Sequence, residues 1–324
     1  MTIALSFFLL IIGILILVVA GDWVVRGAAA LARHWGVPVL IVGLTIVAFG
    51  TSAPELVVGI QAVLEDASEL ASGNIVGSNI ANVFLALGAP ALVMAIPTNM
   101  PGVARNAFVC LVATSIFILL IFLGNPLVMW QGAILLAGIF IFLLWMFRLA
   151  KIGAEDPVLA DITEISQDKD GPPASVWVSA LFVIAGSVGL IAGGKMIVDN
   201  AVDIAEFFGI SETIIGLTIV AIGTSLPEVA TVVVAAWRGH SGVAIGNVIG
   251  SNVFNLFAVG GASALAGPVA VEDKTVMFDI WVMLAAAAAL LFFVLSRQPI
   301  GRRTGLVFLV SYGIYLGVRV LGIT

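Results

Sequence analysis

Two glutamates, Glu55 and Glu228, stand in the middle of long apolar stretches of the sequence. An acidic side chain inside a membrane-spanning helix costs roughly 2.5–3.5 kcal/mol, so some group must compensate its charge. No Lys or Arg lies within ten residues of Glu55, and near Glu228 only Arg238 lies that close. Three compensators remain: protonation, a basic residue distant in sequence such as Arg26 or Lys195, and a bound cation.

The residues beside Glu55 favour the cation. Thr51 lies one helical turn before Glu55 on the same face, and Ser52 is next to it. Pro54 has no N–H, so the carbonyl of Gly50 loses its usual helical partner and becomes available to a cation. The same arrangement recurs 173 residues later, in Gly223, Thr224, Ser225, Pro227 and Glu228.

A polar stripe follows each of these segments. Asn74, Ser78 and Asn82 are spaced i, i+4 and i+8, so they share one helix face. A ligand set made of oxygens, without His or Cys, suits hard ions such as Ca²⁺ and Na⁺ and disfavours zinc or copper. The matching stripe in the second half consists of Asn247, Ser251 and Asn255.

Each of these polar residues has a plainer explanation when it is taken alone. Ser and Thr in membrane helices often bond to their own backbone, and Asn often joins two helices. Recurrence beside a glutamate in both halves favours ligation instead. Asn79 and Asn252 are interpreted as structural contacts, and both explanations stay open for Asn74 and Asn247. The predicted metal ligands are Glu55, Glu228, Thr51, Ser52, Thr224, Ser225, Ser78, Asn82, Ser251 and Asn255.

These recurrences belong to an internal repeat. Residues 43–88 align with residues 216–261 without a gap, and 22 of the 46 positions are identical. The same shift pairs Gly21 with Gly194, so the duplication includes the preceding helix. With five helices in each half, equivalent helices cross the membrane in opposite directions. This is the inverted topology of many secondary transporters, in which the site lies at mid-membrane between the halves.

The composition places the repeat in a lipid bilayer. Of the 324 residues, 61% are hydrophobic and 10% are charged, which excludes a water-soluble enzyme. The formal charge of −6, without a basic patch, argues against nucleic-acid binding. The expected fold is an all-α polytopic membrane protein with ten transmembrane helices in two inverted-topology five-helix repeats. The predicted spans are about 4–32, 37–63, 70–96, 104–123, 127–148, 175–208, 211–236, 241–267, 276–295 and 304–321.

The repeat also predicts the domain boundaries and the orientation. Residues 1–150 form the first five-helix repeat, residues 151–174 a linker loop, and residues 175–324 the second five-helix repeat. Arg26 and Lys195 lie well inside predicted helices and are not counted, and if the N-terminus is outside, nine of the other eleven basic residues fall on the inner side. We therefore expect a cytoplasmic linker, extracytoplasmic termini and a location in the cell (inner) membrane.

The segments GTSAPE and GSNIAN, followed by GTSLPE and GSNVFN, resemble the two alpha-repeats of the calcium/cation antiporter superfamily. The chain is most similar to the prokaryotic sodium/calcium exchangers of that group, over essentially all of its length. The resemblance implies exchange of Ca²⁺ for Na⁺ by alternating access. It also implies the ten ligands above and adds the carbonyls of Ala48 and Ala221.

Departures from related patterns bear on the coupling ion. Some members of the superfamily, including potassium-dependent ones, carry Asp at the position of Asn255, so this chain argues against potassium co-transport. Proton-coupled relatives typically carry Asn-Ala where this chain has Thr51-Ser52 and Thr224-Ser225. The resemblance therefore favours sodium over protons as the coupling ion.

The predicted function is secondary active antiport, with Ca²⁺ and Na⁺ as substrates and the lipid bilayer as surroundings. No cofactor, nucleic acid or obligate protein partner is expected, and the chain is not predicted to be an enzyme. The nearest alternative is a proton-coupled calcium/cation exchanger, because Glu55 or Glu228 could take up protons. An intramembrane hydrolase with paired carboxylates and a cation channel are the competing classes.

Overall fold

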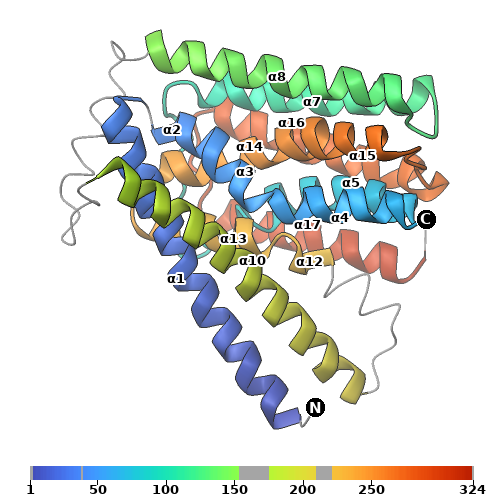
Figure 1. Ribbon diagram of the computed structural model, residues 1–324, viewed down its shortest axis with the longest axis horizontal. Coiled ribbons are helices and arrows are strands. Elements are labelled where there is room, and N and C mark those ends of the chain that lie inside the picture. The colour runs from blue at the N-terminus through green and yellow to red at the C-terminus, as the bar shows by residue number, and fades with distance from the viewer. Residues whose placement is uncertain (1–2, 38, 153–174, 209–220, 323–324) are drawn as a thin grey trace.

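The computed structural model describes residues 3–37, 39–152, 175–208 and 221–322, and every extended regular element within these ranges is a helix (Figure 1). Seven helices are long and apolar enough to cross a membrane, or eight if the bent pair Leu40–Thr51 and Ala53–Leu64 forms one span. An all-helical fold with several spans is thus confirmed. The number ten stays a prediction, because part of the predicted span 211–236 lies outside the described residues.

The first half begins with one long helix, as predicted, and continues with a broken one. The predicted linker at 151–174 lies outside the described residues, apart from residues 151 and 152, which are the last two residues of α8. The elements are α1 (Ile3–Trp35), α2 (Val39–Val42), the π-helix η1 (Gly43–Val47), α3 (Ala48–Thr51), α4 (Ala53–Leu64), α5 (Ser68–Phe84), α6 (Gly88–Ala91), α7 (Val103–Leu123) and α8 (Met129–Ile152).

The second half is built in a similar order. The predicted turn at residues 124–126 is confirmed between α7 and α8, where the Asn125 amide bonds to the backbone of Val271 at 2.8 and 3.0 Å. The elements are α10 (Val176–Phe207), α12 (Ala221–Gly223), α13 (Leu226–Trp237), α14 (Ser241–Phe254), η4 (Asn255–Val259), α15 (Gly260–Ala266), η5 (Thr275–Asp279), α16 (Ile280–Leu295) and α17 (Arg302–Val320).

Helices α1 and α10 lie side by side along much of their length (Figure 1). A methyl group on Gly13 would lie 3.1 Å from the carbonyl oxygen of Gly193, and one on Gly186 would lie 2.8 Å from that of Ala20. From the first of these contacts to the second, the residue number rises in α1 and falls in α10. The two helices therefore run antiparallel. Small residues permit this close approach of the two backbones.

The centre of the molecule is formed by the segments that carry the polar stripes. In the span Ser241–Ala266, 94% of the residues in its most apolar window are buried, and in Ser68–Ala91 72% are. The corresponding share for Ile3–Trp35 is only 22%. Glycines allow the centre to close, since a methyl group on Gly250 would lie 2.5 Å from the carbonyl oxygen of Leu44 in η1. The stripes therefore lie where lipid has no access.

Candidate ion-binding site

The two Thr-Ser-x-Pro-Glu segments form the same local structure. Ser52 has φ −87° and ψ 5°, and Ser225 has φ −88° and ψ 2°. Each serine stands at a break after which a new helix begins, with proline in its first two positions. Proline lacks the N–H that would continue the preceding helix. In the first half the chain bends by 43° at this break.

Both breaks place a glutamate in the first turn of the following helix. Glu55 is 1% exposed in α4, and Glu228 is 0% exposed in α13. Ser52 Oγ donates a hydrogen bond to Glu228 Oε1 at 3.1 Å, and the two carboxylates interact electrostatically. Both oxygens of Glu55, and Oε2 of Glu228, have no hydrogen-bond partner among the described residues. Two such acids side by side require a counter-charge or a proton.

Thr51 connects the first break to α14. Its hydroxyl lies 3.1 Å from Asn247 Oδ1 and 3.3 Å from Ser251 Oγ, both in α14. It also lies 3.3 Å from the carbonyl oxygen of Ala48, which is the backbone bond that the plainer explanation requires. The Thr51 hydroxyl thus lies beside the Ala48 carbonyl of its own helix and beside Ser251 of the other half, and the ligand role of these residues stays a prediction. The Asn247 side chain also belongs to this cluster. One indication of this is present in the sequence, because Asn247 recurs as Asn74 at the same position of the repeat.

Hydrogen bonds between amides connect α5 to α14, and further amide oxygens near them have no partner in the described structure. Asn82 Nδ2 donates to Asn252 Oδ1 at 3.0 Å, and Asn252 Nδ2 donates to the carbonyl of Asn79 at 3.4 Å. Asn252 therefore links the two helices, in keeping with its structural interpretation. Asn82 Oδ1 and both polar atoms of the Asn255 side chain are buried without a partner in the described structure.

The remaining predicted ligands lie at or near the breaks. Ser78 and Ser225 are buried, and their hydroxyls have no partner within the described ranges. Thr224 is half-buried beside Ser225. Ala221 opens α12 directly after residues 209–220, which lie outside the described residues, so the place of its carbonyl in the site stays a prediction.

Among the predicted ligands alone, the unpartnered oxygens fit a hard cation in number and in chemistry. There are seven of them: two on Glu55 and one each on Glu228, Ser78, Ser225, Asn82 and Asn255. Calcium takes six to eight oxygen ligands. The described residues contain no group of three or more His, Cys, Asp and Glu side chains that could hold a metal, so a site for a soft metal is not found there.

The basic residues that could have neutralised the glutamates bridge to aspartates. Arg26 Nη1 lies 3.8 Å from Asp22 Oδ2, and Arg238 also binds Asp22. Lys195 Nζ lies 3.3 Å from Asp199 Oδ2. This leaves a bound cation, or protons, as the compensators of Glu55 and Glu228.

The Ser52 hydroxyl orients the Glu228 carboxylate, so its loss should weaken the site without emptying it of charge. We expect Ser52→Ala to lower the apparent Ca²⁺ affinity about tenfold, since a hydrogen bond to a charged group contributes about 1.5–3 kcal/mol. Calcium-dependent thermal stabilisation measures this affinity. Ser115→Ala is the matched control, because the Ser115 hydroxyl donates only to the Leu111 carbonyl on an exposed surface. Equal affinities for the two variants would contradict the role of Ser52.

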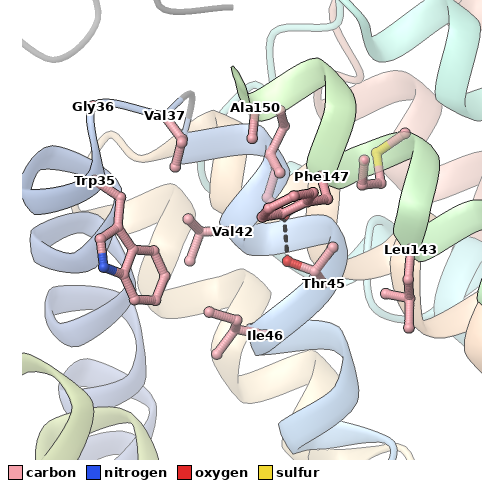
Figure 2. Close-up of a pocket in the computed structure, with 11 residues that line it drawn as sticks. Trp35, Gly36, Val37, Val42, Thr45, Ile46, Leu143, Phe147 and Ala150 are labelled. Carbon is pink, nitrogen blue, oxygen red and sulfur yellow. Dashed lines mark hydrogen bonds between the residues drawn. The ribbon is translucent and has the colours of Figure 1, made fainter. Parts of the chain in front are cut away.

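A separate cavity of about 630 Å³ lies between the end of α1, α2, η1 and α8 (Figure 2). Its lining is mostly apolar and includes Trp35, Ile46 and Phe147. The Thr45 hydroxyl, also in the lining, donates to the Ile41 carbonyl at 2.7 Å. No predicted ligand is among its lining residues in the described structure, so this cavity is not the ion site.

Comparison with known proteins finds relatives that are similar in sequence and in fold. The sodium/calcium exchanger protein family matches residues 5–149 and 178–321. The putative antiporter CaxA of Alkalimonas amylolytica is 35% identical, over 93% of this chain and 94% of its own. The sodium/calcium exchanger MaX1 of Methanosarcina acetivorans is 32% identical, over 98% and 99%. A solved structure of the sodium-calcium exchanger NCX_Mj superposes with a TM-score of 0.82 at 29% identity, over 98% of this chain and 99% of that one.

Proposed function

Because the chain belongs to the sodium/calcium exchanger protein family, we propose that it is a secondary active antiporter that exchanges Ca²⁺ for Na⁺ across a membrane. It is a transporter and not an enzyme, and both ions are substrates. The observation that carries the proposal is the pair of buried acids, Glu55 and Glu228, which interact electrostatically and carry three oxygens without a partner in the described structure, while Ser52 donates to Glu228 alone. Such a pair is tolerable in a bilayer when a cation lies between the carboxylates.

The proposed ligands come from both halves. Thr51 and Ser251 lie together at 3.3 Å, and Ser52 reaches Glu228 at 3.1 Å, so each half contributes to one cluster. Asn247 is added to this set because its oxygen lies 3.1 Å from the Thr51 hydroxyl. The full set is Glu55, Glu228, Thr51, Ser52, Thr224, Ser225, Ser78, Asn82, Ser251 and Asn255 with the carbonyls of Ala48 and Ala221, and now Asn247.

Exchange requires that Ca²⁺ and Na⁺ compete for these oxygens and that the empty site resists a change of exposure. Without a cation, Glu55 and Glu228 face each other in a low-dielectric interior, where unpaired charges are costly. Competition then couples the two fluxes. The inverted arrangement of ten helices in two halves supplies the two exposures, and the antiparallel packing of α1 and α10 supports it.

We place the protein in the cell (inner) membrane with both termini outside and residues 151–174 in the cytoplasm. The distribution of Lys and Arg between the predicted loops supports this orientation. No obligate protein partner is needed by the site, because all of its proposed ligands come from one chain.

Coupling to Na⁺ is preferred over coupling to H⁺. Hydroxyl oxygens at Thr51 and Ser52 are hard ligands that a bound Na⁺ can use, and Thr51 is surrounded by further oxygens. Proton coupling, in contrast, needs only the carboxylates.

The direct test is ⁴⁵Ca²⁺ uptake into proteoliposomes under an imposed Na⁺, K⁺ or H⁺ gradient. We expect uptake when the vesicles are loaded with Na⁺, and no stimulation by K⁺ or by a pH difference alone. Empty liposomes and vesicles with equal Na⁺ on both sides are the controls. Uptake that follows the pH difference and ignores Na⁺ would replace the proposal with proton-coupled exchange.

A further inference from the structure

Asp22 of α1 is held between two arginines. Arg26 Nη1 lies 3.8 Å from Asp22 Oδ2 within the same helix, and Arg238, just after α13, binds Asp22 Oδ1. The three side chains are only 19–22% exposed. The group therefore fastens α1 to the C-terminal end of α13, and Gly21 packs beside it, where a methyl group would lie 3.5 Å from the carbonyl oxygen of Ala230.

The repeat reverses the sign of each charge in this group. A shift of 173 residues places Lys195 at the position of Asp22 and Asp199 at that of Arg26. Arg238 has Glu65 as its counterpart in the first half. Two charged residues still attract each other in the second half only if the charges of both are reversed. All three charges of this group are reversed, so each attraction is kept. The counterpart group is thus Asp199, Lys195 and Glu65.

Only part of the counterpart group is formed. Lys195 Nζ lies 3.3 Å from Asp199 Oδ2, which repeats the contact within one helix. Glu65 Oε1 accepts a hydrogen bond from Gln61 Nε2 at 2.8 Å, and no ion pair between Lys195 and Glu65 is found in the described part of the chain. The Lys195 side chain is 76% exposed, against 22% for Asp22.

The packing of the helices differs in the same sense. Helix α1 packs along α13, whereas the described residues of α10 have no comparable packing along α4. Gly194, the counterpart of Gly21, lies instead near Gly223 and Pro227 of its own half, with a methyl group 3.7 Å from Pro227 Cδ. In this structure the contact between α1 and α13 is therefore closed, and the corresponding contact between α10 and α4 in the other half is open.

We propose that Lys195 and Glu65 form an ion pair in the opposite access state and that this pair alternates with Asp22–Arg238 during transport. The proposal rests on the proposed function, because it requires two inverted halves that exchange roles. A charge at membrane depth needs a partner or water. The ion pair that is formed therefore closes the protein on its own side of the membrane. The two charged residues of the pair that is broken face water on the opposite side. These four residues determine to which side the ion site opens.

The test uses a thiol that only one state exposes. Cys110 is the sole cysteine and is buried, so Cys110→Ala provides the background, and Val234→Cys places a thiol beneath α1, because Val234 Cγ2 would lie 3.4 Å from a methyl group on Gly21. A water-soluble thiol reagent should react when α1 leaves α13. We expect Asp22→Asn and Arg238→Gln each to raise the labelling rate about fivefold. Lys195→Gln and Glu65→Gln should each lower it about fivefold, because they destabilise the opposite state.

Coupling between two residues that do not touch here is the decisive result. Glu65→Gln combined with Lys195→Gln should lower labelling no further than either change alone. The exchange Glu65→Lys with Lys195→Glu keeps both charges and should restore labelling to within about twofold. Asp199→Asn is the matched control, since Asp199 contacts Lys195 only within α10, and it should change labelling by less than about twofold.

The proposal of alternating ion pairs would be overturned if the Glu65→Gln and Lys195→Gln substitutions had additive effects on the labelling rate. It would also be overturned if the charge exchange failed to restore that rate. Labelling needs no ion flux, so the outcome is separate from the proposed function. If Na⁺-driven Ca²⁺ uptake is normal but Glu65 and Lys195 show no coupling in the labelling rate, the alternating ion pairs are refuted and the antiport is not. Coupling in a chain that shows no exchange refutes the antiport and retains the pairs.

Discussion

Glu228→Gln is expected to abolish Ca²⁺ uptake driven by a Na⁺ gradient, and Glu55→Gln is expected to do the same. We expect a loss of more than about 100-fold, because even partners outside the coordination shell of a metal contribute 10–100-fold. The amide oxygen of Gln can still accept the hydrogen bond that Ser52 donates to Glu228 Oε1 at 3.1 Å. The change therefore removes a charge and leaves the local geometry in place.

Two measurements separate a lost site from a lost fold. Size-exclusion profiles of both variants should match that of the unchanged protein. Calcium at 100 times its Kd should stabilise the unchanged protein by about 2.7 kcal/mol and leave the two variants unaffected. Glu69→Gln, which neutralises an exposed carboxylate at the start of α5, is the control and should transport normally. Near-normal exchange by either Glu55→Gln or Glu228→Gln would end the assignment of the site.

Gly250→Ala is expected to lower the free energy of unfolding by about 3 kcal/mol and to impair transport. The added methyl group would lie 2.5 Å from the carbonyl oxygen of Leu44 and 2.6 Å from Ala48 Cβ. Overpacking costs about 1–3 kcal/mol, and a backbone carbonyl cannot rotate away as a side chain can. Separating α14 from η1 would also move Ser251 away from Thr51, which lie 3.3 Å apart.

Gly313→Ala is the matched control for this prediction. Gly313 lies within α17, and a methyl group there would have no described atom within 4 Å. Alanine in place of a helical glycine with free space should stabilise the protein by about 0.4–1 kcal/mol. Thermal unfolding of both variants in detergent, together with ⁴⁵Ca²⁺ uptake, measures the difference. A Gly250→Ala protein as stable and active as Gly313→Ala would show that α14 and η1 need not approach so closely.

Helix boundaries were predictable only where the sequence changes composition. The first helix and the turn at residues 124–126 follow directly from apolar length and from Gly-Asn-Pro. The predicted span 70–96 is instead divided into α5 and α6, and 241–267 contains the π-helix η4. Pro90 lies just after the first interruption and lacks the N–H that would continue a helix, a signal that the predicted span did not use. The residues Asn255–Val259 of η4 contain neither Gly nor Pro, so no such signal marks the second interruption.

The need of the two glutamates for a compensating group was predictable from the sequence, whereas the hydrogen bonding of the amides was not. A buried acid needs a compensating charge wherever the chain places it, so Glu55 and Glu228 follow from the cost of burial alone. Asn82 and Asn252 have the same side chain on helices of the same type. Their hydrogen bonding differs, since both ends of the Asn252 amide make hydrogen bonds, whereas Asn82 keeps an unpartnered oxygen in the described structure.

By itself, the sequence determined that the chain spans a membrane, that it contains a repeat, and that the two acids must be compensated. Hydropathy, identity between two segments and the cost of a buried charge all depend on residue types along the chain. Only the tertiary structure decided which oxygens meet. Thr51 reaches Ser251, Ser52 reaches Glu228, and Arg238 reaches Asp22 rather than a glutamate. Each of these contacts joins residues more than 170 positions apart, so it depends on how the two halves pack against each other and on nothing within either segment.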